Sequence, residues 1–148
     1  MSIREILNKF KGLSLSQLSK IVYNECCMAY PQMKRALGMQ EAMDTMTHII
    51  LCTMAVDGFM ATYEFAVVRE TLETLQSRCL TEEDCVRMIN GCKSGYSSNL
   101  NACVAFMRSV AQADPDTFAH LCSMIGAIIV ANGTIDRLEE AWFSEFFN

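Results

Sequence analysis

Apolar residues recur every three to four positions along most of the chain, and the pattern is densest in two segments. Between residues 40 and 56, Met43, Met46 and Met54 form one stripe, which neighbouring apolar residues widen until little polar surface remains. Residues 117–131 have the same character. A helix that is apolar on nearly every side is typical of the centre of a protein. Because no segment alternates polar and apolar residues with the period of a strand, the pattern predicts an all-α fold of seven to nine helices.

Glycine, proline and serine residues predict where several of these helices begin and end. A short N-terminal helix is expected to end near Gly12, and Ser14 or Ser16 is expected to cap the next one. Pro31 is expected to break that helix, because a proline inside a helix lacks an N–H donor and clashes with the preceding turn. Gly38 then closes a short turn that follows the proline.

In the second half of the chain, polar runs separate the predicted helices. Thr81 is followed by three acidic residues, which predicts an N-cap with acids in the first turn, where the helix dipole favours them. That helix is expected to reach Cys92, and residues 93–99 to form a loop. Two further helices are expected over residues 100–113 and 117–131.

The two strongly apolar helices belong to a unit that occurs twice. When the chain is aligned with itself so that Asp57-Gly58 falls on Asn132-Gly133, Glu64 falls on Glu139. A duplicated structural unit is the simplest explanation. The prediction is a single domain over residues 1–148. It begins with an N-terminal helical addition over residues 1–39 and a first repeat unit over residues 40–78. Connecting helices over residues 79–114 and a second repeat unit over residues 115–148 follow.

The net charge of −5 is unevenly distributed along the chain. Residues 1–40 carry six Lys/Arg and two acids (+4), whereas residues 41–148 carry six Lys/Arg and fifteen acids (−9). The acidic part argues against a nucleic-acid partner, because such binding depends on neutralising phosphates. Two interpretations of the basic part remain: contact with an anionic surface, including peripheral association with a membrane, or contact with the acidic remainder of the molecule.

Several features lead us to expect a cytoplasmic protein with no transmembrane segment. The N-terminal residues lack the apolar core of a signal peptide. The longest uncharged apolar stretch, residues 121–131, is far shorter than the roughly 20 residues that cross a bilayer. Most of the eight cysteines occupy apolar helix positions, so they are expected to be reduced core residues.

The repeated turns also resemble the second half of an EF-hand loop, in which an Asp-Gly pair precedes an apolar residue and a bidentate Glu. The candidate ligands are Asp57, Glu64, Asn132, Asp136 and Glu139. The first half of the loop is missing, so each turn offers too few oxygens for tight calcium binding. Two interpretations remain open: the glutamates cap the helices that follow, or each turn binds a divalent cation, calcium or magnesium, weakly.

At these residues the sequence resembles the TerB-like family of tellurite-resistance-associated helical domains, which also occur in some membrane-anchored DnaJ-type co-chaperones. The resemblance is carried by Ala-Val-Asp-Gly-Phe-Met at residues 55–60 with Glu64, and by Val-Ala-Asn-Gly-Thr-Ile-Asp at residues 130–136 with Glu139. It implies a bacterial all-helical domain with paired helices, a role in stress response or protein assemblies, and a divalent-cation site at the acidic turns. Asn132 departs from the aspartate that the family usually has there.

No pattern of catalytic residues is apparent along the chain. Neither His48 nor His120 has a second histidine or a carboxylate three or four residues after it, as a zinc or general-base site would want. Asp44 stands four residues before His48, which fits a hydrogen bond along a helix face. Cys85 and Cys92 share one face with apolar residues, which favours a core stripe over a ligand set. We therefore expect a non-enzymatic protein.

The last helix predicts a surface for a partner. Trp142, Phe143, Phe146 and Phe147 fall within six positions, and four rings around a short helix are expected to be hard to bury in one chain. The sequence therefore predicts a TerB-like module that binds a protein partner and a divalent cation. The alternative is a structural homodimer or scaffold without a ligand, held together by this aromatic helix.

Overall fold

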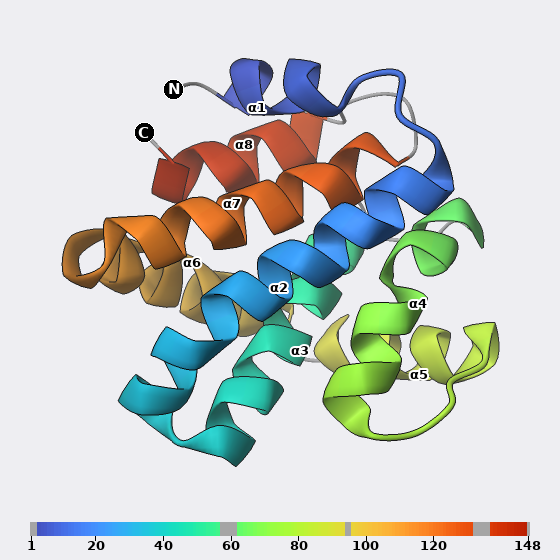
Figure 1. The fold of residues 1–148 in the computed structure, drawn as a ribbon, viewed down its shortest axis with the longest axis horizontal. Coiled ribbons are helices and arrows are strands. Elements are labelled where there is room, and N and C mark those ends of the chain that lie inside the picture. The colour runs from blue at the N-terminus through green and yellow to red at the C-terminus, as the bar shows by residue number, and fades with distance from the viewer. Residues whose placement is uncertain (1–2, 57–61, 94–95, 132–136, 148) are drawn as a thin grey trace.

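The structure, a computed structural model, describes residues 3–56, 62–93, 96–131 and 137–147. These residues form eight α-helices and contain no strand (Figure 1). In chain order the helices are α1 (Ile3–Phe10), α2 (Leu15–Leu37), α3 (Met39–Ala55), α4 (Thr62–Gln76), α5 (Glu82–Lys93), α6 (Tyr96–Ala113), α7 (Pro115–Val130) and α8 (Arg137–Phe147). The predicted all-α class and the expected number of helices are confirmed.

Helix α2 runs without interruption through Pro31, so the predicted break is wrong. The proline removes the N–H that would bond to the Cys27 carbonyl, but both residues are exposed, and water can satisfy that carbonyl. Val22 and Ala29 before the proline and Met33 after it are buried. Packing on both sides of Pro31 therefore outweighs a local cost of about 3 kcal/mol.

The predicted roles of Gly12, Gly38 and Ser14 at helix ends are confirmed. Gly12 and Gly38 follow α1 and α2 with φ of +83° and +86°, a region that glycine enters at little cost. Ser14 begins α2 with a capping box. Its Oγ accepts a hydrogen bond from the Gln17 N–H at 3.1 Å, and Gln17 Oε1 accepts one from the Ser14 N–H at 2.9 Å.

The N-cap predicted at Thr81 is confirmed and forms a capping box, whereas α6 begins earlier than expected. Thr81 Oγ accepts from the Asp84 N–H at 3.1 Å, and Asp84 Oδ2 accepts from the Thr81 N–H at 2.9 Å. These hydrogen bonds to Thr81 lower the pKa of Asp84. Helix α6 starts at Tyr96, so most of the loop predicted over residues 93–99 is wrong. The polar run belongs partly to the first turn of a helix, where Asn99 is half-buried.

The helix pairs α3–α4 and α7–α8 repeat at the predicted spacing. Helices α3 and α7 end at Ala55 and Val130, which are equivalent in the alignment of the chain with itself. Helices α4 and α8 begin at Thr62 and Arg137, which are equivalent in the same alignment. Burial follows the same register, because equivalent residues such as Ile50 and Ile125, or Val68 and Phe143, are completely buried. The internal repeat of helix–turn–helix units is therefore confirmed in the helix boundaries and in the core.

Helix α2 lies across both units rather than beside them, although it belongs to the segment that the sequence marks as an addition. It packs against α7 of the second unit and against α4 and α3 of the first (Figure 1). Leu18, Val22 and Ala29 join a single cluster of buried side chains that extends from Ile6 to Phe146. No helix in the described ranges combines the length and the apolar character needed to cross a membrane.

Helix α1 lies close to α7 at Gly126. A Cβ at this position would stand 2.7 Å from Ile6 Cγ2 and 3.5 Å from Phe10 Cε2. Since carbon atoms pack favourably at about 3.5–4.0 Å, the first of these contacts is a clash. The absence of a side chain at Gly126 therefore allows α1 to cover this part of α7.

We predict that Gly126→Ala lowers the thermal unfolding temperature. Overpacking costs about 1–3 kcal/mol, which exceeds the roughly 1 kcal/mol that alanine gains over glycine in a helix. Gly91→Ala is the matched control, because a Cβ at Gly91 meets nothing within 4 Å. It should leave the unfolding temperature unchanged or raise it. Circular dichroism melts compare the two, and a Gly126→Ala protein as stable as Gly91→Ala would contradict the packing described.

Candidate functional site

Two of the five predicted cation ligands lie within the described residues. Glu64 is in the first turn of α4 and Glu139 is in the first turn of α8, with exposed fractions of 4% and 3%. No other acidic side chain in the described ranges is buried. Asp57, Asn132 and Asp136 lie outside the described residues.

The position of Glu64 is marked by its effect on a cysteine. Burial raises the pKa of the Cys85 thiol to about 12, and the nearby charges of Glu82 and Glu64 raise it further, which places Glu64 close to α5. Among the described side chains, neither Glu64 nor Glu139 belongs to a group of three potential metal ligands. A cation site that includes either glutamate therefore needs ligands beyond the described His, Cys, Asp and Glu side chains.

The aromatic side chains of α8 are largely buried within the chain. Trp142, Phe143 and Phe146 are at most 5% exposed, and the half-buried Phe147 stacks on Phe118 with ring centroids 6.1 Å apart. The expectation that one chain could not bury them is wrong, because α1 and α6 both pack against α8. That these rings bind a partner stays a prediction, but it is no longer supported by their expected exposure.

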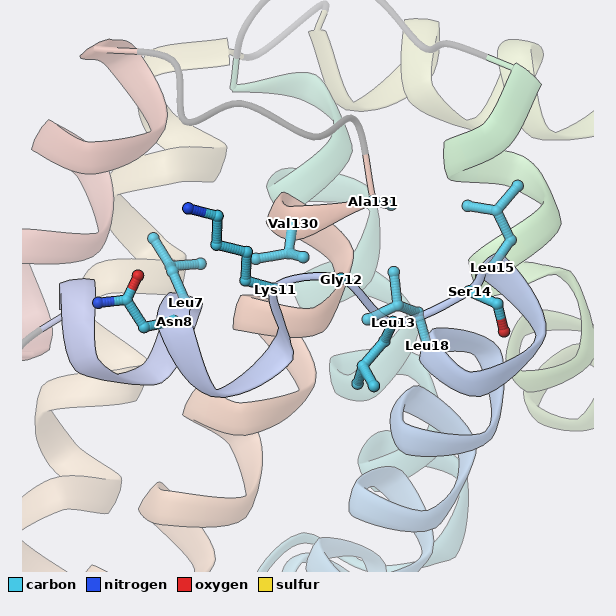
Figure 2. Close-up of a pocket in the computed structure, with 10 residues that line it drawn as sticks. All are labelled: Leu7, Asn8, Lys11, Gly12, Leu13, Ser14, Leu15, Leu18, Val130 and Ala131. Atoms are coloured by element: carbon cyan, nitrogen blue, oxygen red, sulfur yellow. The ribbon is translucent and has the colours of Figure 1, made fainter.

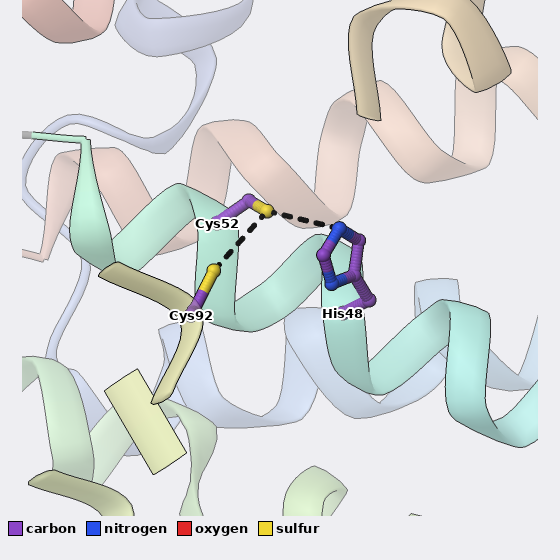
Figure 3. Close-up of side chains that lie close together, drawn as sticks. All are labelled: His48, Cys52 and Cys92. Atoms are coloured by element: carbon purple, nitrogen blue, oxygen red, sulfur yellow. Dashed lines mark hydrogen bonds between the residues drawn. The ribbon is translucent and has the colours of Figure 1, made fainter. Parts of the chain in front are cut away.

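A histidine and two cysteines from different helices meet inside the molecule. His48 and Cys52 lie one turn apart on α3, and Cys92 lies near the end of α5 (Figure 3). Cys52 Sγ is 3.4 Å from His48 Nε2 and 3.7 Å from Cys92 Sγ. One possible ligand atom from each of the three residues lies within 4.8 Å of the other two. We call these three residues the His–Cys cluster.

The surroundings of the His–Cys cluster hold its thiols in the protonated form. Burial, with the proximity of Cys52, raises the pKa of Cys92 to about 12. A hydrogen bond with Cys103 and burial raise the pKa of Cys52, against the opposing effect of His48. The contact with Cys52 also raises the pKa of His48, although burial opposes it. Protonated thiols are poor nucleophiles, so the arrangement argues against thiol catalysis by these residues.

Sequence reasoning missed this cluster, although part of the signal was visible. His48 and Cys52 have the i, i+4 spacing that brings two side chains together on a helix. Asp44 instead accepts a hydrogen bond from Gln40 Nε2 at 3.0 Å, so the predicted bond from Asp44 to His48 is wrong. Cys92 is buried as predicted, but it also faces Cys52 across 40 residues of sequence, which no local pattern reveals.

The second histidine also has a partner that is distant in sequence. His120 Nδ1 of α7 lies 2.6 Å from Glu25 Oε2 of α2, and the two side chains are 32% and 27% exposed. An imidazole held by a carboxylate is one half of a nucleophilic site. In the described part of the chain, no hydroxyl or thiol completes it. The pair therefore serves to join α2 to α7, at a strength of up to about 1 kcal/mol.

A cavity of about 570 Å³ lies between α1, the start of α2 and the end of α7 (Figure 2). Leu7, Leu13, Leu18 and Val130 give it an apolar lining, and Lys11 is the one charged residue among its described lining residues. Its volume is in the range of small-molecule sites, but such sites also have several converging polar groups. The cavity has no such set and indicates no particular ligand.

Comparisons with known proteins add no relative. No family model matches the chain, and neither the curated proteins nor the solved structures give a match.

The exposure of each cysteine predicts how quickly a thiol reagent modifies it. All eight are free, with Cys27 and Cys79 exposed and the other six buried. In the native protein at neutral pH, a thiol reagent should modify these two quickly, because the buried thiols are shielded from the reagent. All eight should react after unfolding. Mass spectrometry counts the adducts, and Cys27→Ser and Cys79→Ser should each remove one fast site. Rapid native modification of the remaining six would contradict this structure.

Proposed function

We propose that the chain is a non-enzymatic, TerB-like helical module that binds a divalent cation weakly at its two repeated turns and binds a protein partner. One observation carries the proposal. Glu64 and Glu139, the buried acidic side chains of the described chain, occupy the same place in the two repeat units, in the first turns of α4 and α8.

Their burial distinguishes these glutamates from the helix caps elsewhere in the protein. In the capping boxes of α2 and α5, the side chains that reach back to the helix start are Gln17, which is exposed, and Asp84, which is half-buried. Capping therefore needs no deep burial in this fold. A buried carboxylate is costly unless charge-assisted hydrogen bonds or a cation compensate its charge. The positive end of the helix dipole favours a negative charge at the starts of α4 and α8, and a bound cation would stabilise it further.

The chemistry of the turns favours a hard cation and a low affinity. Carboxylate and amide oxygens suit calcium, magnesium or manganese. Calcium takes six to eight oxygens, and each turn offers far fewer, so water would fill most of the coordination sphere. We expect binding at millimolar rather than micromolar concentrations.

The partner-binding part of the proposal is supported by an apolar hollow between α2, α3 and α4. It has a volume of about 290 Å³ and is lined by Tyr23, Cys27, Tyr30 and Met43, among others. The methionine and tyrosine side chains that line this hollow suit the binding of an apolar side chain from a partner. The homodimer alternative loses support because the rings of α8 are largely buried.

We predict that calcium, magnesium or manganese, added to the metal-free protein, shifts the amide resonances of Gly58 and Gly133. Glu64→Gln should abolish the response of the first turn only, and Glu139→Gln that of the second turn only. The exposed residues Glu70 and Glu145 on the same two helices provide matched glutamine controls, which should respond as the unaltered protein does. Circular dichroism checks that each variant is folded.

Two results would contradict the cation part. Resonances of both glycines that stay unmoved at millimolar ion would show that the turns bind none of these cations. A response that survives in the Glu64→Gln and Glu139→Gln proteins would show that the ions bind elsewhere.

A further inference from the structure

Two distances in the His–Cys cluster match those of a tetrahedral metal centre. Zinc bonds of about 2.3 Å to sulfur and 2.0–2.1 Å to nitrogen place two sulfurs about 3.8 Å apart, and a sulfur and a nitrogen about 3.6 Å apart, when the angles are tetrahedral. The observed separations are 3.7 Å between Cys52 Sγ and Cys92 Sγ and 3.4 Å between Cys52 Sγ and His48 Nε2. Ligand atoms of His48 and Cys92 lie within 4.8 Å of each other, so a change in the His48 or Cys92 side-chain rotamer can bring all three ligands to one ion.

From this geometry we propose that His48, Cys52 and Cys92 bind one metal ion of the zinc class, with three protein ligands and one open position. Thiolate and imidazole ligands select borderline and soft ions such as zinc over calcium or magnesium. The site is thus different in chemistry from the two acidic turns, and it stands independently of the function proposed for them.

The charge of the complex suits the interior. A divalent ion displaces the thiol protons of Cys52 and Cys92, which pass to solvent, and neutral His48 binds through a ring lone pair. Two thiolates balance the charge of the ion, so the complex is neutral. Cys52 is completely buried and Cys92 is 8% exposed, where a charged complex would be costly. Half-buried His48 offers a route from solvent.

Asn99 of α6 contacts all three proposed ligands. Its backbone carbonyl accepts hydrogen bonds from His48 and, at 3.8 Å, from the Cys52 thiol. Its side-chain Nδ2 donates to the Cys92 carbonyl. Histidines that bind metals commonly donate their second ring N–H to a backbone carbonyl, which fixes the orientation of the ring. The structure therefore contains a group that could orient the ligands as well as the ligands themselves.

A disulfide between Cys52 and Cys92 fits the same atoms less well. A disulfide bond is about 2.05 Å long, so the two sulfurs would have to approach by well over 1 Å, whereas a tetrahedral ion accepts the observed separation. Such a bond would also require an oxidant and leave His48 without a role. Metal binding therefore explains the positions of all three residues.

The reduced, metal-free full chain titrated anaerobically with cobalt(II) tests this proposal. We expect one tetrahedral cobalt ion per chain, with thiolate-to-cobalt charge-transfer absorption that zinc abolishes. Native mass spectrometry of the zinc-loaded protein should show the mass of one zinc ion added and two protons lost.

Substitutions identify the ligands. His48→Gln and Cys92→Ser should each weaken cobalt binding by at least about tenfold, since each removes one of three ligands. Cys85→Ser and Cys122→Ser are matched controls at fully buried cysteines outside the cluster, and they should leave the spectrum unchanged. His48 is half-buried, so its substitution is compatible with folding, which circular dichroism verifies. Glu64→Gln and Glu139→Gln should also leave the spectrum unchanged, which separates this site from the acidic turns.

Three results would overturn the proposal. The first is the absence of a charge-transfer band at excess cobalt. The second is a spectrum that persists unchanged in folded His48→Gln and Cys92→Ser proteins. The third is loss of the band on substituting the exposed cysteines Cys27 and Cys79, which would assign the binding to the surface.

Discussion

The fold depends on covering two helices that have almost no polar face. Helix α3 buries Met46 to Ala55 with the exception of half-buried His48, and α7 buries an equally continuous run from Met124 to Ile129. Neither helix could form a stable unit with its following helix alone, because one partner covers only one side. Helix α2 supplies the shared cover, since it packs on α3, α4 and α7. This requirement explains why the chain forms one core rather than two.

The burial of α3 also determines which residues His48 contacts. Because α3 is surrounded by other helices, its one strongly polar side chain in this run, His48, has to find partners inside the molecule. It finds Cys52 on its own helix and the Asn99 carbonyl on α6. The second helix of each unit begins beside the end of a buried helix, so the glutamate in its first turn is drawn into the interior. The two buried glutamates therefore lie in the first turns of the second helices of the two units.

Local sequence patterns predict most of the fold, whereas contacts between residues that are distant in sequence cannot be predicted from them. The repeat, the glycine helix ends and the N-caps at Ser14 and Thr81 depend on neighbouring residues, and the structure confirms them. The predicted helix break at Pro31 is wrong because the free-energy cost of a proline is local. The packing of α2 that offsets this cost involves helices distant in sequence. The burial of the α8 rings depends on α1 and α6, which are distant in sequence and pack against α8. The pairs Cys52–Cys92 and Glu25–His120 span 40 and 95 residues, which no spacing rule connects.

The claim that the repeated turns are cation sites rather than caps is tested most directly by anomalous diffraction from crystals grown with manganese. We expect two anomalous peaks, one within bonding distance of the Glu64 carboxylate and one within bonding distance of the Glu139 carboxylate. No peak at either residue, with both carboxylates accepting hydrogen bonds from the backbone of their own turns, would contradict this claim and leave the glutamates as buried helix caps.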